Sequence, residues 1–417
     1  MGAFAGGCDL AAISAVASGG ADAFNRVAEL ADAALLRVAD GPDGEPRARM
    51  LQTVQAFARA ALHEAGEWDE IRNAHASFYA DLAEELSSRL DGPSALAARD
   101  RIEAELENIR VALGWCLDKA ADGNPPPERL TIGLRLSQAM SWFWYAFGYT
   151  AEGHRWQRRA VAVASAAGGP ELAAALHGLA VLLLQQGETA EAKDALTTCL
   201  QIRRETGDRS KTAMELNSLG VAHWTLGDLG TGRTMLRESI DIAREIGDES
   251  RESTALSNLG AFEVGANNCE HGIELLERAL AIDARLGNVW GCAVIQSNLT
   301  AAMLRTGRAD EAYTTLRSQA ADMIGLGDIE LTIEIIELMA GAFSQRGDAR
   351  RAAKLLGTSE ALREQAGMPI RITDAQLLEE FLAPARGLLS TDQWEEERRA
   401  GRTLNVQEAL AEAGMAD

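Results

Sequence analysis

Glycine recurs at a fixed interval of 40 residues through the second half of the chain. The first series is Gly207, Gly247, Gly287, Gly327 and Gly367. A second series lies halfway between, at Gly187, Gly227, Asn267, Gly307 and Gly347. Its one non-glycine member is an asparagine, which tolerates the left-handed backbone region better than other residues with a side chain. Each 40-residue unit therefore contains two breaks in regular structure.

The segments between the breaks carry apolar residues at the spacing of a helix face. They are roughly 15 to 18 residues long. Examples are Leu179, Leu182 and Leu183 in one segment and Ala192, Leu196 and Leu200 in the next. Each unit therefore reads as a helix, a tight turn, a second helix and another turn.

Packing positions follow the same period. Apolar residues recur at Leu196, Leu236, Leu276, Leu316 and Leu356, and also at Leu179, Leu219, Leu259, Leu299 and Met339. Small residues recur at Ala192, Gly232, Gly272, Ala312 and Ala352, which indicates that two helices cross closely there. One helix pair cannot bury its own apolar face, so neighbouring pairs must stack to complete a core. We therefore predict an all-α, right-handed solenoid of helical hairpins.

This pattern resembles the tetratricopeptide repeat (TPR) in its longer variant of about 40 to 42 residues. The resemblance covers five clear repeats, and a sixth, degenerate repeat is expected at 129–168, so that residues 129–368 hold six repeats. The chain departs from the usual pattern at Gly232, Gly272 and the pair Asn267 and Asn268. In such a solenoid, the first helices of the repeats line a concave groove.

The chain is strongly acidic, with a formal net charge of −22 and a pI near 4.8. Such a surface repels the nucleic-acid backbone, which Lys and Arg normally neutralise. We therefore do not expect direct nucleic-acid binding. The charge fits solvated outer helix faces or, alternatively, an acidic surface that recruits a basic partner. No apolar run reaches the roughly 18 to 20 residues of a membrane span, so we expect a cytoplasmic protein with no membrane partner.

The chain carries no motif typical of an enzyme. The five cysteines are scattered and the six histidines lack the spacing of a zinc site. There is no phosphate-binding loop or nucleophile elbow, and no pair of carboxylates stands out for acid and base chemistry. We therefore expect no catalytic residues, no cofactor and no metal.

Residues 1–66 differ in character from the repeats. The pattern predicts helices at Asp9–Ala17 and Asp22–Ala33, strands at Leu35–Val38 and Arg47–Leu51, and a helix at Gln52–Ala65. Two helices followed by a hairpin are typical of a winged-helix domain.

This stretch resembles the winged helix that follows the nucleotide-binding domain of bacterial NB-ARC signalling ATPases (the STAND type), including LuxR-like transcriptional regulators with TPRs. The residues that carry the resemblance are Phe4–Gly7, Leu35–Leu36 and Arg49–Val54. In that family one more helix precedes the domain, so the resemblance implies a truncated winged helix and a nucleotide-binding ATPase module as a partner. A Met-His-Asp sensing motif would fall on Met50, Leu51 and Gln52, two of which depart from it. The simpler expectation is that Met50 and Leu51 belong to the hairpin core.

The helix that would read DNA in a winged helix has the wrong charge for that role. It carries Asp22, Glu29 and Asp32 against Arg26 alone, whereas a groove-entering helix needs cations for phosphates and donors for base edges. We therefore expect a hinge or contact module.

Residues 67–128 read as a pair of long helices, Trp68–Leu90 and 95–120. The second resembles the segment that these regulators carry between winged helix and repeats. On it, Asn108 and Arg110 are expected to be polar residues of a packing helix. An aromatic run follows at 142–156, which either seals the first repeat or forms a ligand pocket.

Residues 369–417 are expected to form a helical cap that ends the repeats at Pro369. Helices are predicted at Ala375–Leu389, Thr391–Gly401 and Val406–Ala413. The family resemblance extends to this terminal segment.

Polar residues recur on the first helices just before the shared leucine, at Asn217, Ser218, Asn258 and Asn298. Similar asparagines in kinesin-light-chain repeats bind the backbone of extended peptides, because a carboxamide offers a donor and an acceptor. Alternatively, these residues bridge neighbouring helices within the protein. Further along the same helices, the candidate specificity contacts are Trp224, Glu263 and Arg305.

Together these features favour a non-catalytic sensing module of a STAND-type ATPase or transcriptional regulator. A protein, peptide or small effector is expected in the groove. A free-standing TPR adaptor is one alternative, and a regulator that binds DNA through the winged helix is another.

Overall fold

The computed structural model describes residues 1–17, 23–41, 44–90, 92, 94–118 and 125–414. They divide into two compact units, which we describe separately. The first comprises Met1–Leu90, Ser94–Phe143 and Arg155–Ala175, and the second comprises Asp91–Pro93, Trp144–His154 and Leu176–Asp417. No helix within the described residues is both long and apolar enough to cross a membrane.

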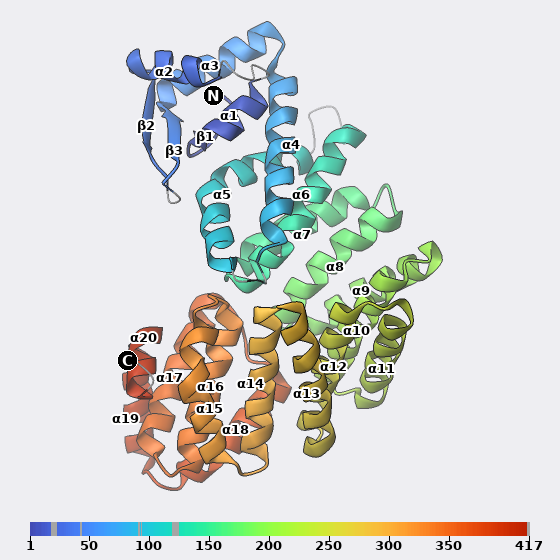
Figure 1. Cartoon of the computed structure of the whole chain (residues 1–417), viewed down its shortest axis with the longest axis vertical. Coiled ribbons are helices and arrows are strands. Elements are labelled where there is room, and N and C mark those ends of the chain that lie inside the picture. The colour runs from blue at the N-terminus through green and yellow to red at the C-terminus, as the bar shows by residue number, and fades with distance from the viewer. Residues whose placement is uncertain (18–22, 42–43, 91, 93, 119–124, 415–417) are drawn as a thin grey trace. The chain divides into compact units, whose positions relative to one another are not determined.

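The first unit opens with a small antiparallel sheet of three strands in the order β1-β3-β2 (Figure 1). The strands are β1 (Cys8–Asp9), β2 (Leu36–Asp40) and β3 (Pro46–Met50), and the helices beside them are α1 (Leu10–Val16), α2 (Ala23–Asp32) and α3 (Gln52–Ala65). The Asp9 carboxylate accepts a hydrogen bond from Ala12 N and so caps α1. The predicted two helices and hairpin are confirmed as elements, except that Asp22 lies outside the described residues.

The prediction that Met50 and Leu51 both belong to the hairpin core is wrong for Leu51. Met50 is half-buried, but Leu51 is 38% exposed and Gln52 is also exposed, because the chain turns there to begin α3. The interior of this sheet is instead made by Cys8, Leu36 and Ala48.

Two long helices, α4 (Trp68–Ser87) and α5 (Ala95–Leu117), pack against each other in the same unit. Their contact is built from an apolar stripe that includes Tyr79 and Ala83 on α4 and Ile102 and Leu113 on α5, all buried. The predicted segment 119–120 at the end of α5 lies outside the described residues. Next come α6 (Pro127–Ala146) and α7 (Thr150–Ala164), on which the degenerate repeat expected at 129–168 falls.

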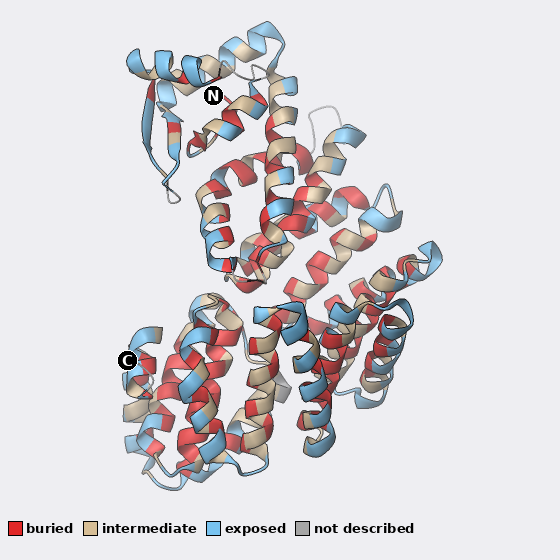
Figure 2. Cartoon of the chain, in the orientation of Figure 1, coloured by how far each residue is buried: buried red, intermediate tan, exposed pale blue. Residues whose placement is uncertain are grey.

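The repeats follow with one helix pair every 40 residues. The first helices are α8 (Gly169–Gln185), α10 (Arg209–Thr225), α12 (Glu249–Gly265), α14 (Val289–Arg305) and α16 (Ile329–Gln345). The second helices are α9 (Thr189–Thr206), α11 (Leu229–Ile246), α13 (Cys269–Leu286), α15 (Ala309–Ile324) and α17 (Ala349–Ala366). Buried residues gather between neighbouring helices, and exposed ones lie on the outer turns (Figure 2).

The recurring glycines end helices, as the sequence predicts. Gly207 follows α9 with a φ of 71°, and its amide N–H bonds back into the last turn. The aspartate after it, Asp208, accepts a hydrogen bond from Lys211 N and caps α10. Asn267, the exception in the series, has a φ of 67°.

In the two repeats that carry glycine in place of alanine, at Gly232 and Gly272, the helices cross too closely for a side chain. A Cβ atom on Gly232 would lie 2.9 Å from the carbonyl oxygen of Gly220, and one on Gly272 would lie 2.8 Å from that of Gly260. Alanine at either position would therefore push α10 from α11 or α12 from α13.

The first helices form the inner row of the second unit. Each of α10, α12 and α14 contacts the next first helix along the chain, whereas the second helices make no comparable contacts with one another among the described residues. This row continues past Met368, which corrects the expectation that the repeats end at Pro369. Helix α18 (Ile372–Arg386) packs beside α16, and its Ala385 N donates a hydrogen bond to Ser344 Oγ over 3.1 Å. Two further helices, α19 (Thr391–Gly401) and α20 (Val406–Glu412), complete the cap.

Candidate functional site on the inner helices

The inner row presents a repeated stripe of side chains, which is half-buried on α10 and ranges from buried to exposed at the equivalent positions of α12 and α14. On α10 the stripe includes Met214, Asn217, Ser218 and Val221, which lie at intervals of three and four residues and so share one face. The same positions 40 and 80 residues later hold other small, polar or aliphatic residues. The stripe is thus a repeated surface of short amide, hydroxyl and aliphatic side chains.

Two of the predicted asparagines contact each other across adjacent repeats. Asn258 Nδ2 donates a hydrogen bond to Asn217 Oδ1 over 3.0 Å. This contact is the bridging role that the sequence left open. Each amide still has a free group, because Asn258 Oδ1 and Asn217 Nδ2 have no partner among the described residues.

The other two predicted polar residues make no hydrogen bond within the described part of the chain. Asn298 on α14 and Ser218 on α10 are both half-buried, so water still reaches their side chains. Neither side chain is therefore committed to holding the solenoid together.

Trp224 lies between repeats. Its ring centroid is 5.5 Å from that of Phe262, and a Cβ atom on Gly265 would lie 3.1 Å from the indole. The ring is half-buried, so one part packs against α12 and the rest stays accessible.

Glu263 does not lie in the predicted place. Its side chain is 2% exposed and accepts two hydrogen bonds from Arg233 of α11, at 2.7 and 3.1 Å, and one from Asn268 at 2.8 Å. Burial would raise the pKa of this carboxyl, but these hydrogen bonds outweigh it and lower the pKa. Glu263 therefore stabilises a helix junction and is not available to a partner.

Arg305 is also taken up within the protein. Its Nη1 donates to the carbonyl oxygens of Val264 and Gly265 at the end of α12, and its Nη2 pairs with Glu380 of α18 at 3.0 Å. A cation at a helix C-terminus is favourable because the last carbonyls carry partial negative charge. The side chain links three inner helices, so its role as a specificity contact is not supported by its position.

The inner stripe becomes acidic on α16. Tyr145 Oη donates to Glu330 over 2.8 Å, and Arg371 lies 3.3 Å from the same carboxylate and 3.8 Å from Glu334. Burial and then the neighbouring Glu330 raise the pKa of Glu334. Arg371 also pairs with Asp374 at 2.6 Å, so one guanidinium serves three carboxylates.

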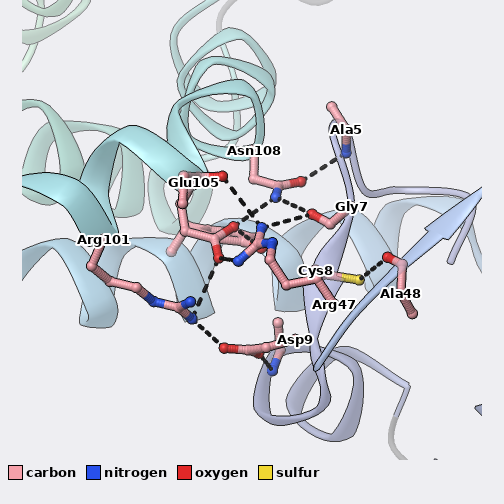
Figure 3. A network of polar contacts seen from close by, with 12 residues as sticks. Ala5, Gly7, Cys8, Asp9, Arg47, Ala48, Arg101, Glu105 and Asn108 are labelled. Atoms are coloured by element: carbon pink, nitrogen blue, oxygen red, sulfur yellow. Dashed lines mark hydrogen bonds and ion pairs between the residues drawn. The ribbon is translucent and has the colours of Figure 1, made fainter. Parts of the chain in front are cut away.

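A second polar cluster, in the first unit, was not expected from the sequence (Figure 3). Asn108 of α5 is fully buried, accepts a hydrogen bond from Ala5 N over 2.7 Å and donates one to Gly7 O over 2.8 Å. Its carboxamide thus pairs with the backbone just before β1. The expectation that Asn108 is an ordinary polar residue of a packing helix is corrected by these bonds.

Glu105, one turn earlier, completes this cluster. It is 1% exposed, forms a salt bridge with Arg47 of β3, and accepts hydrogen bonds from Tyr79 Oη at 3.0 Å and Asn108 Nδ2 at 2.8 Å. The hydrogen bond with Glu105 raises the pKa of Arg47. The signal in the sequence was a glutamate and an asparagine on the apolar stripe of α5, where neither residue is stable without a partner.

Buried His75 borders the cluster. Its Nε2 lies 3.5 Å from Asn108 Oδ1, its Nδ1 has no partner within the described residues, and its ring contacts Phe4. Burial lowers the pKa of His75 to about 4. The imidazole is therefore neutral at pH 7.

No group of three or more potential metal ligands is found among the described residues. The charged residues of helix α2 are one cation, Arg26, and two carboxylates, Glu29 and Asp32.

Comparison with known proteins supports the repeat architecture. A family model described as tetratricopeptide repeat matches residues 172–206, which span most of α8 and all of α9. Two proteins named as HTH-type transcriptional regulators, from Mycobacterium tuberculosis and Mycobacterium bovis, are 33% identical over 158 residues. That match covers 37% of this chain but 17% of each regulator.

Among solved structures, a Rap protein complexed with Competence and Sporulation Factor matches with a TM-score of 0.52 at 12% identity, over 82% of this chain and 88% of that one. A STAND protein with a TPR sensor from Pyrococcus horikoshii matches with a TM-score of 0.43 at 14% identity, over 98% of this chain and 62% of that one. The helix pairs of this chain therefore form a solenoid of tetratricopeptide-repeat type.

Proposed function

We propose that this chain is a non-catalytic sensing and interaction module of a signalling ATPase or transcriptional regulator, and that its inner helices bind an extended peptide segment of a partner. One observation carries the proposal. The inner stripe holds amide and hydroxyl groups, on Asn298, Ser218 and the Asn217–Asn258 pair, whose donors or acceptors are not all used by the described residues and remain accessible.

An extended peptide has the complementary groups. Each residue offers one N–H and one C=O, and a carboxamide binds both at once. The aliphatic residues Met214, Val221 and Val294 of the same stripe are half-buried and supply apolar contact for its side chains. The backbone of the peptide binds the asparagine side chains whatever the sequence of the peptide. The aliphatic positions of the stripe select among the side chains of the peptide.

The named relatives favour a regulatory setting. The two mycobacterial proteins are named as HTH-type transcriptional regulators, and the Rap protein was solved with Competence and Sporulation Factor bound. For this chain we accordingly propose a regulatory role and a bound peptide. Other forms of the same proposal are a free-standing TPR adaptor and a groove that takes a small effector.

The N-terminal sheet fits the contact role expected of a winged helix. Two helices lie between β1 and β2, and β3 pairs with both of the other strands. We infer that residues 1–66 bind a nucleotide-binding module rather than DNA, because the described part of α2 has one arginine against two carboxylates. A gel shift at low salt checks this inference, and a salt-dependent complex with duplex DNA would contradict it.

Display of random 12-residue peptides against the full chain tests the proposed binding surface. Peptides that enrich should bind the wild type, and Asn298→Ala should weaken them at least tenfold without changing the melting temperature. Gln201→Ala is the matched control, because Gln201 is an exposed amide on the outer helix α9. Failure to enrich any peptide, or equal affinity for the wild type and Asn298→Ala, would refute the proposal.

A further inference from the structure

Three arginines of the first unit have no carboxylate partner among the residues that the structure describes. Arg59, Arg72 and Arg129 are half-buried, yet none forms an ion pair among the described residues. Every other buried or half-buried arginine in the described part of the chain pairs with a carboxylate; these are Arg47, Arg99, Arg101, Arg110, Arg135, Arg203, Arg233, Arg251, Arg305, Arg363, Arg371, Arg398 and Arg402. The exceptions are notable in a chain with a net charge of −22.

Arg72 and Arg129 lie against the same ring, that of Trp115, and the charge of Arg59 also acts on Arg72. Burial lowers the pKa of Arg72, and the charges of Arg59 and Arg129 lower it further. Asp69 acts in the opposite sense, but it forms no ion pair with Arg72 among the described residues. Partly buried cations are normally paired, because removing a charge from water is costly.

Aromatic rings hold two of these guanidinium groups in place. Arg72 Cζ lies 5.3 Å from the ring centroid of Trp68 and 4.9 Å from that of Trp115, and Arg129 Cζ lies 3.8 Å from the Trp115 ring. His63 continues the stack, with its ring centroid 4.6 Å from that of Trp68. The indole of Trp115 is fixed in turn by a hydrogen bond from Nε1 to Asn73 Oδ1 of 2.9 Å. Four helices, α3 to α6, each contribute to this stack.

The cations are ordered without being fully hydrogen-bonded. Arg72 Nη2 donates to Val111 O over 3.2 Å, and Arg59 Nε donates to Gly2 O over 2.9 Å. The Nε atoms of Arg72 and Arg129 are buried and have no partner within the described part of the chain. Cation–π contacts offset part of the cost of burial but not the mutual repulsion of the cations. A bound anion would offset both the cost of burying these cations and their mutual repulsion.

We propose that Arg59, Arg72 and Arg129 form a binding site for the phosphate group of a small molecule. A phosphate carries up to two negative charges and several acceptor oxygens, which suits neighbouring planar guanidinium groups better than a single carboxylate does. The site lies within the first unit and is separate from the inner helices of the repeats. It is independent of the peptide-binding proposal.

Calorimetric titration of the full chain with inorganic phosphate, pyrophosphate and ADP tests the site, with sodium chloride added to equal ionic strength. We expect saturable binding of at least one probe and a rise in melting temperature. Tighter binding of ADP than of pyrophosphate would identify a nucleotide as the source of the phosphate, and equal binding would identify the phosphate groups alone. Absence of binding for all three probes at millimolar concentration would overturn the proposal.

Variants locate the binding. Arg129→Gln should weaken the bound probe at least tenfold, and Arg129→Lys, which keeps the charge but loses the planar fork, should weaken it less. Arg237→Gln is the matched control, because Arg237 is exposed on α11 and lacks an ion pair among the described residues. If Arg129→Gln and Arg237→Gln bind the probe equally, the anion lies elsewhere and the proposal is wrong. Should Arg129→Gln fail to fold, Arg129→Lys decides instead, and a probe affinity equal to that of Arg237→Gln would contradict the proposal.

Discussion

Gly357 of α17 and Gly401 of α19 lie against each other with no room for a side chain on either. A Cβ atom on Gly357 would lie 1.9 Å from Arg398 O, and one on Gly401 would lie 1.7 Å from Lys354 O. Thr358 Oγ1 donates a hydrogen bond to Gly401 O over 2.9 Å at the same crossing. The C-terminal cap therefore depends on two glycines that the 40-residue pattern does not predict.

Gly401→Ala should separate α19 from α17. The obstacle is backbone, which cannot rotate away as a side chain can, so we expect a loss of about 1–3 kcal/mol in the free energy of unfolding. Urea denaturation measures it. Gly387→Ala is the control, because a Cβ atom there meets nothing within 4 Å. Equal stability of the two variants would show that the crossing can open without cost.

Leu236→Ala tests the repeated core. Leu236 is fully buried in the cluster formed by α11 to α14, so we expect a loss of about 2–5 kcal/mol. Because each repeat depends on its neighbours, hydrogen exchange should also accelerate in α12 and α13. Leu226→Ala serves as the control, since Leu226 is 47% exposed. A Leu236→Ala chain that melts like the wild type would place the core elsewhere.

Asn108→Ala should loosen the N-terminal sheet from α5. It leaves Ala5 N and Gly7 O without their partner, and we expect about 1–3 kcal/mol for the buried groups that remain unpaired. Limited proteolysis within residues 1–66 should become faster. Glu107→Ala removes an exposed pair with Arg110 on the same helix and should cost about 0–1 kcal/mol. Proteolysis at the wild-type rate would mean that the sheet is held by other contacts.

Acid should destabilise the first unit through His75. Its pKa is about 4 in the folded chain, whereas an unperturbed histidine has a pKa of 6.5, so the unfolded state binds the proton first as pH falls. The contribution is complete above pH 6.5 and is lost as pH falls through 4, with about 2 kcal/mol gone at pH 5.

His75→Phe isolates this effect. Phenylalanine keeps an aromatic ring beside Phe4 and Tyr79 but has no proton to bind. Hydrogen exchange in α4 and α5 should then change less between pH 7 and pH 5 than it does in the wild type. An identical pH response would assign the effect to another group.

The sequence predicted the repeat region more closely than the chain ends. The helix limits of α8 to α17 follow the glycine spacing, and the leucines at 196, 236, 276, 316 and 356 are all buried. The continuation of the inner row into α18 was missed, because Pro369 and the loss of the glycine signal suggested an end. In fact the packing register survives, with Phe381 against Gly341.

The candidate site was predicted only in part. The positions of Asn217, Asn258 and Asn298 on the inner helices follow from the repeat. Glu263 and Arg305 were expected to face a partner, but Arg233 and Glu380 engage them instead. Helical spacing shows which face a residue occupies, but it does not show which side chain from another helix reaches that face.

The sequence by itself determined the period, the helix ends and the core positions of this protein, because left-handed glycines, aspartate caps and helical apolar spacing act within a few residues of one another. Only the tertiary structure decided which polar groups form hydrogen bonds within the fold and which remain available to bind a partner. That decision depends on contacts such as Asn108 with Gly7, which are 101 positions apart, and on the arrangement of Arg72 and Arg129, from two different helices, around the ring of Trp115.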